Sequence, residues 1–300
     1  MGSMVTYYMG RVAKGGQLDS EKIIQAILNP KPIEWWGKGW SFFDAQRYHI
    51  REIDFVFAKL SKFHPEGEVV IADPDAKKEA IQMEPNLRIA SSTFIYIPKY
   101  SGIIFTTHPN HIKEHQFGYR FSHIISNTYD DFFVDCTVNL ISDLRTFAEK
   151  LSKLKGIYKI NAKVNPPNPL FGPLWKSLKD YVDSRNSDSM LVREQAGDDA
   201  PLNTDLPMHV QKVVSQINTV PYLPPEPLPI GDAAILMAAD GYGEGLVQGY
   251  QEGRERVTIK TSETNRNFAF DRDPDPVDLF DEACAIFDRI EADRHMEHGE

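Results

Sequence analysis

Basic side chains gather between residues 145 and 193, where ten Lys and Arg stand against four Asp and Glu. Lysine and arginine side chains neutralise phosphates, and aromatic rings stack on unpaired bases. A basic stretch with interleaved aromatic residues therefore predicts nucleic-acid binding. Lys159 and Lys163 have the even spacing that places both on one face of a strand. The alternative is an ordinary solvated lysine face. The candidate nucleic-acid-binding residues are Arg145, Lys150, Lys153, Lys155, Lys159, Lys163, Trp175, Lys176 and Lys179.

Histidines form a second candidate site. His111 and His115 are four residues apart and would share a face if residues 109–127 form a helix, with His108 one turn earlier and Asn110 as a possible cap. Two imidazoles on one helix face can bind zinc. However, the order HIKEH lacks the HExxH glutamate beside a metal-bound water, so a solvated helix face is the simpler interpretation.

Aspartates could instead hold magnesium for a nuclease reaction. Two groups qualify, at 130–135 and in the loop at 271–278, but the second is weak evidence and is more simply interpreted as a solvated connection into a helix. We predict no catalytic residue, no metal and no cofactor. The aspartates concerned are Asp130, Asp131, Asp135, Asp271, Asp273, Asp275 and Asp278.

The segment Asp240-Gly241-Tyr242-Gly243 follows an apolar run. Glycines in such a place can let a phosphate approach the backbone. The segment matches neither a dinucleotide-binding fingerprint nor a P-loop, so a tight structural turn is the alternative interpretation.

Aromatic side chains are densest between residues 35 and 43. Trp35, Trp36, Trp40, Phe42 and Phe43 could belong to the core or anchor an interface, because tryptophan is enriched where proteins bind one another.

Composition predicts a globular protein. The 300 residues are 41% apolar and 25% charged, and we expect both cysteines, Cys136 and Cys284, to be buried in the core. Residues 1–200 carry 25 basic and 24 acidic side chains, whereas residues 201–300 carry 8 and 19. The sequence contains no long apolar run and no signal-peptide pattern, so we expect a cytoplasmic protein that does not insert into membranes.

These side chains must be positioned by helices and strands, and the order of the expected elements predicts an α+β fold. We expect mainly antiparallel sheet, a split βαβ-like unit and packed helices. We expect strands at 5–13, 49–63, 131–141, 157–165 and 254–262, a hairpin at 92–108, and helices at 20–28, 142–155, 174–185 and 276–293. Residues 64–90 are polar and predict a loop. The expected parts are a mixed region at 1–90, a ββαβαβ-like part at 91–185, a flexible proline-rich excursion at 186–230 and a strand–helix part at 231–300.

Three segments together resemble an uncharacterised bacterial family of unknown-function domains related to RexA, a phage-exclusion sensor. They are VTYYMGRVA, VNPPNPLFGPLWKSLKDYVDSRNS and ILMAADGYGEGLVQGYQEGRERVTIKTS. The resemblance implies a role in abortive infection, nucleic-acid binding, a homodimer and action through an effector protein encoded nearby. The residues that match the family pattern are Pro167, Asn168, Pro169, Trp175, Asp240, Gly241, Gly243, Thr261 and Ser262.

Three functions follow as hypotheses. The first is a DNA- or RNA-binding sensor or regulator in bacterial phage defence. The second is a metal-dependent nuclease effector that uses the clustered aspartates or histidines. The third is a protein–protein adaptor that uses Trp35, Trp36 and Trp40.

Overall fold

The computed structural model describes residues 3–73, 75, 77–165, 174, 176–185, 187, 189–197, 200–216 and 222–293. The chain divides into two compact units. One, here called the N-terminal unit, comprises Val5–Tyr7 and Lys14–Val138. The other, here called the C-terminal unit, comprises Met1–Met4, Tyr8–Ala13 and Asn139–Glu300.

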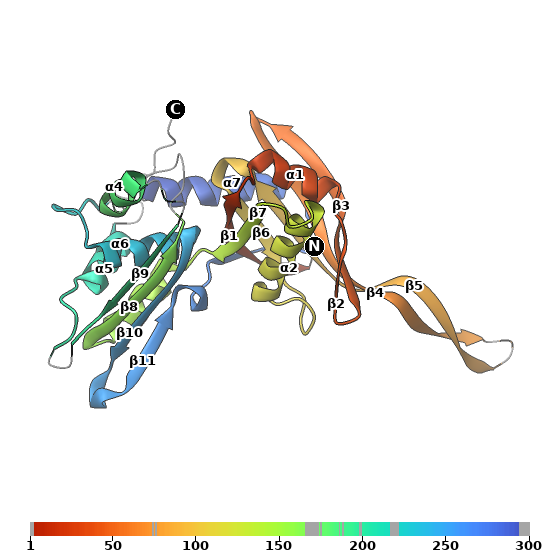
Figure 1. The fold of residues 1–300 in the computed structure, drawn as a ribbon. Coiled ribbons are helices and arrows are strands. Elements are labelled where there is room, and N and C mark those ends of the chain that lie inside the picture. The colour runs from red at the N-terminus through yellow and green to blue at the C-terminus, as the bar shows by residue number, and fades with distance from the viewer. Residues whose placement is uncertain are drawn as a thin grey trace. The chain divides into compact units, whose positions relative to one another are not determined.

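The described strands form an eight-stranded and a four-stranded sheet (Figure 1). The larger has the order β12-β1-β6-β5-β4-β3-β2, with β7 also paired to β1, and the smaller has the order β11-β10-β8-β9. The strands are β1 (Met4–Gly16), β2 (Ile33–Trp35), β3 (Lys38–Ile50), β4 (Ile53–Asp73), β5 (Lys78–Ile97), β6 (Gly102–Thr106), β7 (Val134–Leu140), β8 (Gly156–Val164), β9 (Met190–Gln195), β10 (Gly243–Tyr250), β11 (Arg256–Lys260) and β12 (Asn267–Asp271).

The helices pack against these sheets through apolar faces. They are α1 (Ser20–Leu28), α2 (Glu114–Thr128), α3 (Leu144–Ser152), α4 (Lys176–Arg185), α5 (Leu206–Ser215), α6 (Ile230–Met237) and α7 (Pro276–Asp293). Helix α1 begins where the Asp19 carboxylate accepts a hydrogen bond from the Lys22 backbone N–H, at 2.7 Å. Within the described part of the chain, no helix has an apolar stretch that could traverse a bilayer.

Aromatic packing between α2 and the sheet forms the core of the N-terminal unit. The Phe105 ring of β6 lies parallel to that of Phe117 on α2, with centroids 3.9 Å apart. One turn later on α2, Phe121 contacts Phe42 of β3 and Phe94 of β5. This packing fixes the face of α2 that the sheet covers and so determines which helix residues lie near β2 and β3.

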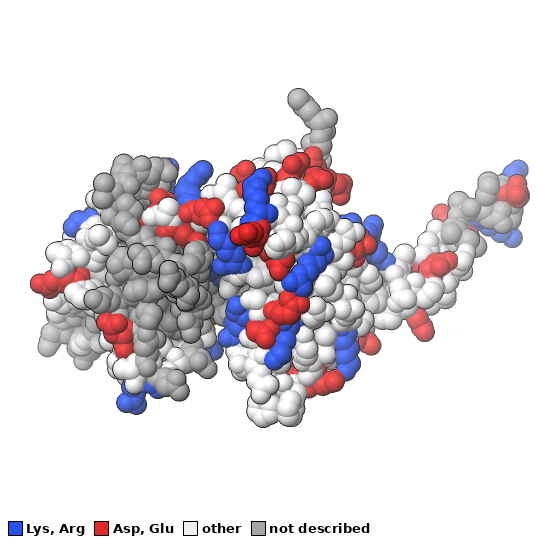
Figure 2. All heavy atoms as spheres, turned by 90° about the horizontal axis from the view of Figure 1, so that it is seen from above, with Lys and Arg blue, Asp and Glu red and all other residues white. Residues whose placement is uncertain are grey.

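Strands β4 and β5 continue beyond their neighbours as a long two-stranded arm (Figure 1). The pairing runs from Val56↔Tyr96 to Asp73↔Lys78. The described residues on the face of the arm that Figure 2 shows are mostly uncharged, with scattered acids and bases. The expected loop at 64–90 is therefore wrong. Both faces of this ribbon meet solvent, so its residues lack the core-facing apolar alternation by which a half-buried strand is recognised.

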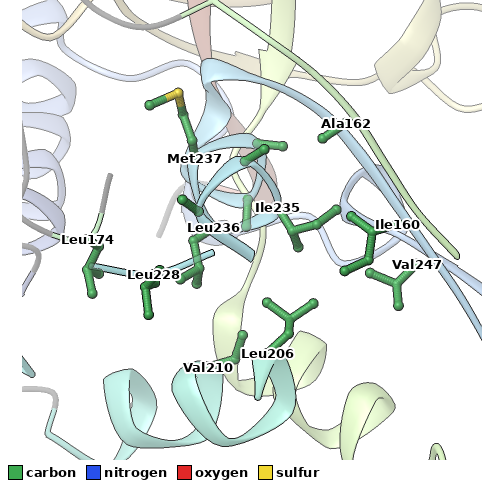
Figure 3. Close-up of a cluster of buried hydrophobic side chains, with 14 of the residues drawn as sticks. Ile160, Ala162, Leu174, Leu206, Val210, Leu228, Ile235, Leu236, Met237 and Val247 are labelled. Atoms are coloured by element: carbon green, nitrogen blue, oxygen red, sulfur yellow. The ribbon is translucent and has the colours of Figure 1, made fainter. Parts of the chain in front are cut away.

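The C-terminal unit has a core between one face of the four-stranded sheet and helices α3, α5 and α6. Side chains from β8, β10, α5 and α6 gather in a single cluster (Figure 3). The apolar run at 233–239 forms most of α6 and the start of the turn after it. Each of these residues is buried, as expected for a helix that is apolar on all sides.

The predicted α+β class with mainly antiparallel sheets is confirmed. Helix α2 connects β6 and β7, and both strands pair with β1, which gives the split arrangement expected of this part. Strand β8, which follows α3, lies in the four-stranded sheet instead. The expected excursion at 186–230 contains strand β9 and helix α5 among its described residues.

Candidate nucleic-acid interface

Strand β8 places Lys159 and Lys163 on the solvent side of the four-stranded sheet. Ile160, Ala162 and Val164 alternate with them and are buried in the core, so the two lysines point away from it. The prediction that both share one face is confirmed. Register extends this face across the sheet, because Lys159 lies opposite Gln195 and Gln248, and Lys163 lies opposite Leu191 and Glu244.

Three further cations lie on the same face, and sequence reasoning did not select them as site residues. Arg193 of β9 pairs with Asn161, which lies between the two lysines on β8. On the other side, Lys260 and Arg256 of β11 lie opposite Leu246 and Tyr250 of β10. We call the surface formed by Lys159, Lys163, Arg193, Arg256 and Lys260 the cationic face.

Few carboxylates neutralise the cationic face. Lys260 lies 3.8 Å from Glu263, measured from Nζ to Oε1. Among the residues that the structure describes, no carboxylate forms an ion pair with Lys159, Lys163, Arg193 or Arg256. The Arg256 guanidinium instead lies over the Tyr158 ring, 5.8 Å from its centroid. Glu244, which lies opposite Lys163, adds one negative charge, so the face keeps an excess of positive charge for an anionic ligand.

The remaining predicted cations lie elsewhere. Helix α3 packs into the core through Leu144, Phe147 and Leu151, so its Arg145, Lys150 and Lys153 belong to the helical layer and not to the exposed sheet face. Lys155, in the connection to β8, lies 3.3 Å from a Glu252 carboxylate oxygen. The structure thus divides the predicted basic stripe between two layers.

Several predicted residues cannot be placed. Pro167, Asn168, Pro169 and Trp175 lie outside the described residues. Lys176 and Lys179 belong to helix α4, and their side chains also lie outside the described part.

A π-helical turn, Ala238–Tyr242, follows α6 and contains Asp240 and Gly241, and Gly243 begins β10. Gly241 has φ +86°, and a Cβ there would lie 2.9 Å from Cγ1 of Ile141. A Cβ at Gly243 would collide with the Lys163 carbonyl oxygen. Both glycines therefore have a structural reason to be glycine, in agreement with the tight-turn interpretation.

The histidines do not share a helix face. Asn110 adopts φ +64°, a conformation that an α-helix cannot continue, and α2 begins only at Glu114. His111 therefore precedes the helix that carries His115, which corrects the expected helix at 109–127. Among the described residues, no group of three or more His, Cys, Asp or Glu side chains is arranged to hold a metal ion.

The aromatic cluster at 35–43 divides between core and surface. Trp40 and Phe42 are buried, whereas Trp35, Trp36 and Phe43 are exposed. Of the two cysteines expected in the core, Cys136 is buried and Cys284 is only partly so. Burial raises the pKa of the Cys136 thiol to about 12.

Comparison with known proteins gives one family. No curated protein matches the chain. A family model described as "Domain of unknown function (DUF4747)" matches residues 22–218, which span the greater part of the sequence. The chain therefore belongs to the DUF4747 family of domains of unknown function.

Proposed function

We propose that this protein binds nucleic acid through the cationic face. Its proposed biological role is that of a sensor or regulatory component in a bacterial anti-phage system, acting through a partner protein encoded nearby. The observation that carries the binding proposal is the set of four cations without carboxylate partners, among the described residues, on a sheet face that no helix covers. The anti-phage role, the partner and a homodimer rest on the RexA-like sequence segments.

Charge and hydrogen-bonding side chains both favour this ligand. Lysine and arginine side chains that lack carboxylate partners can neutralise phosphates and release their counterions. Gln195, Gln248 and Thr258 add hydrogen-bonding side chains on the same face, since they pair with one another or with Lys159 across the strands. Polar side chains of this kind contact phosphate and sugar oxygens. The net charge of −10 on the whole chain limits attraction elsewhere.

The test compares two charge reversals of equal size. Lys159→Glu/Lys163→Glu alters the cationic face, and Lys150→Glu/Lys153→Glu alters helix α3 by the same change in net charge. Binding of a fluorescent DNA duplex is measured by anisotropy at several salt concentrations. We expect the first variant to bind at least about tenfold more weakly and to show a shallower salt dependence, because each lost phosphate contact lowers the slope by about 0.9.

The α3 variant is the matched control and should bind nearly as well as the wild type. Equal losses in both variants would show that net charge alone governs binding, and would contradict the cationic face as the interface. Unchanged binding in Lys159→Glu/Lys163→Glu would contradict it directly.

A further inference from the structure

The tip of the β2–β3 hairpin presents a tryptophan in a strained conformation. Trp35 pairs with Lys38, so Trp36 and Gly37 form a two-residue turn, with φ +50° and +65°. Positive φ at both central residues is typical of a type I′ turn, which favours Asn-Gly. A bulky side chain at positive φ is a genuine outlier, and such strain concentrates at functional sites. Trp36 is nevertheless 89% exposed, so burial does not explain its presence.

Other rings support Trp36 from behind. The Trp35 ring stacks on that of Trp36, with centroids 6.4 Å apart and planes inclined by 22°. Two side chains of α2 contact Trp35 edge-on, Tyr119 at 5.9 Å and His123 at 6.1 Å between centroids. These contacts hold Trp35 in place and leave the exposed Trp36 as the outer member of the stack.

A buried arginine lies beneath this stack. Arg120 of α2 is only 8% exposed, and its guanidinium carbon lies 4.6 Å from the Trp35 ring centroid and 5.1 Å from that of Trp40. Within the described part of the chain, Nε and Nη1 of Arg120 and Nε1 of Trp40 have no hydrogen-bond acceptor, and no carboxylate pairs with Arg120. Buried charges are normally paired, so this region has donors and positive charge in excess.

Two lysines extend the positive charge to the surface. Lys62 of β4 pairs with Trp40, and its Nζ lies 5.4 Å from the centroid of that ring. Burial lowers the pKa of Lys62, and the nearby Lys38 and Arg120 lower it further. Lys38 Nζ lies 2.9 Å from Nδ1 of His64. Like charges that approach one another without an acid between them favour an anion that neutralises them.

We propose that this aromatic–cationic cluster, formed by Trp35, Trp36, Lys38, Lys62 and Arg120, binds single-stranded nucleic acid. An unpaired base stacks on the free face of Trp36, and Lys38 and Lys62 contact the adjoining phosphates. Arg120 contributes its uncompensated charge from below. The proposal rests on the proposed function and deepens it, because it assigns the cluster a preference for unpaired strands.

The chemistry of the cluster separates single strands from duplexes. The faces of bases inside a duplex are covered by their neighbours, so an external tryptophan reaches a base face only where the strand is unpaired. Stacking on an aromatic side chain is tolerant of sequence, because every base has a π-face. We therefore expect strand selectivity with little base selectivity.

The test replaces Trp36 without damaging the turn. Trp36→Asn removes the ring and supplies the residue that a type I′ turn favours, so the unfolding midpoint should not fall. Trp36→Tyr keeps a stacking ring and is the matched control. Binding of fluorescent oligo(dT) and of a duplex of equal length is measured for both variants, for Lys159→Glu/Lys163→Glu and for the wild type.

We expect Trp36→Asn to bind oligo(dT) about five- to hundredfold more weakly than the wild type, with duplex binding unchanged and Trp36→Tyr close to wild type. Wild-type affinity of Trp36→Asn for oligo(dT) would overturn the inference and leave Trp36 as a protein-docking residue. If Lys159→Glu/Lys163→Glu alone loses duplex binding in that case, the proposed function stands. If Trp36→Asn alone loses oligo(dT) binding, the inference stands and the cationic face fails. A wild-type protein that binds neither probe overturns both.

Discussion

Arg11 donates a hydrogen bond from Nε to the backbone carbonyl of Asp240, 3.1 Å away and 229 residues later in the chain. The Arg11 side chain is 1% exposed, and its guanidinium carbon lies 4.6 Å from the Tyr242 ring centroid. On another side, Nη1 lies 3.7 Å from a carboxylate oxygen of Glu291, which is also buried. A single arginine of β1 thus connects the turn after α6 with the last helix of the C-terminal unit.

We expect Arg11→Ala to lower the free energy of unfolding by about 3–5 kcal/mol, because it removes the buried cation that faces the Glu291 carboxylate. Urea denaturation monitored by circular dichroism measures this loss. The control is Lys59→Ala, which removes an exposed ion pair with Asp44 and should cost no more than about 1 kcal/mol. Equal losses in both variants would show that the buried pair contributes no more than a surface pair.

The turn before β10 gives a second prediction about stability. Gly243→Ala places a Cβ against the Lys163 carbonyl oxygen of the neighbouring strand, where backbone cannot move aside cheaply. We expect a loss of about 2–3 kcal/mol in the free energy of unfolding. Gly197→Ala is the matched control, because no atom lies within 4 Å of the added Cβ. A Gly243→Ala protein as stable as Gly197→Ala would show that the turn relaxes easily.

Asp232 predicts a loss of stability as the pH rises. The residue is 1% exposed, and burial, followed by the nearby Glu194 and Asp205, raises its pKa from 3.8 to about 6, although the Thr204 hydroxyl donates a hydrogen bond to it. A raised pKa means that the folded state holds the proton more tightly than the unfolded chain does. This tighter binding stabilises the folded state fully below about pH 4. The stabilisation is lost as the pH rises through about 6, which lowers the free energy of unfolding by about 3 kcal/mol.

Asp232→Asn removes this titration, so the variant should gain stability relative to the wild type between about pH 4 and pH 7. The measurement is the difference in unfolding free energy between the two proteins at a series of pH values. Glu149→Gln, at an exposed carboxylate on α3, removes one negative charge in the same way and serves as the control for that change. A constant difference between wild type and Asp232→Asn would mean that Asp232 titrates normally.

His209 predicts the opposite dependence. Its Nδ1 lies 2.9 Å from the Tyr222 hydroxyl, and burial lowers the pKa of the imidazole, which nearby Asp205 raises and Lys212 lowers. The folded state therefore favours the neutral ring. Its contribution is complete above the ordinary histidine pKa and is lost as the pH falls through the lowered value. We expect the unfolding temperature of the wild type to fall more on acidification than that of His209→Gln, as calorimetry can measure.

Much of the secondary structure follows from local pattern. Helices α1 and α7 coincide with their predicted ranges, because an aspartate cap begins the first and a regular apolar face defines the second. The β4–β5 arm could not be predicted in the same way. Its two strands pair with each other without covering a core, so they carry no apolar stripe. Strand β9 could not be predicted for a related reason. The residues that flank it are polar, and its partner strand β8 lies far from it in the sequence.

The candidate sites illustrate the same limit. The spacing of Lys159 and Lys163 predicts that they share one face of a strand. The register of the strands places Arg193, Arg256 and Lys260 on that same face, and a single sequence does not reveal this register. The density of aromatic side chains between residues 35 and 43 is enough to single out Trp35 and Trp36. Their relation to Arg120 depends on how α2 packs on the sheet, and no local signal encodes that packing.

The contact between Arg11 and Glu291 also has a consequence for synthesis on the ribosome. Arg11 leaves the exit tunnel long before the carboxylate that faces it, which belongs to helix α7. Until Glu291 has emerged, its ion pair with Arg11 cannot form, and a charged side chain resists burial until it is paired. The C-terminal unit should therefore close only after Glu291 has emerged from the ribosome, and nascent chains stalled before residue 291 should remain open to protease at β1.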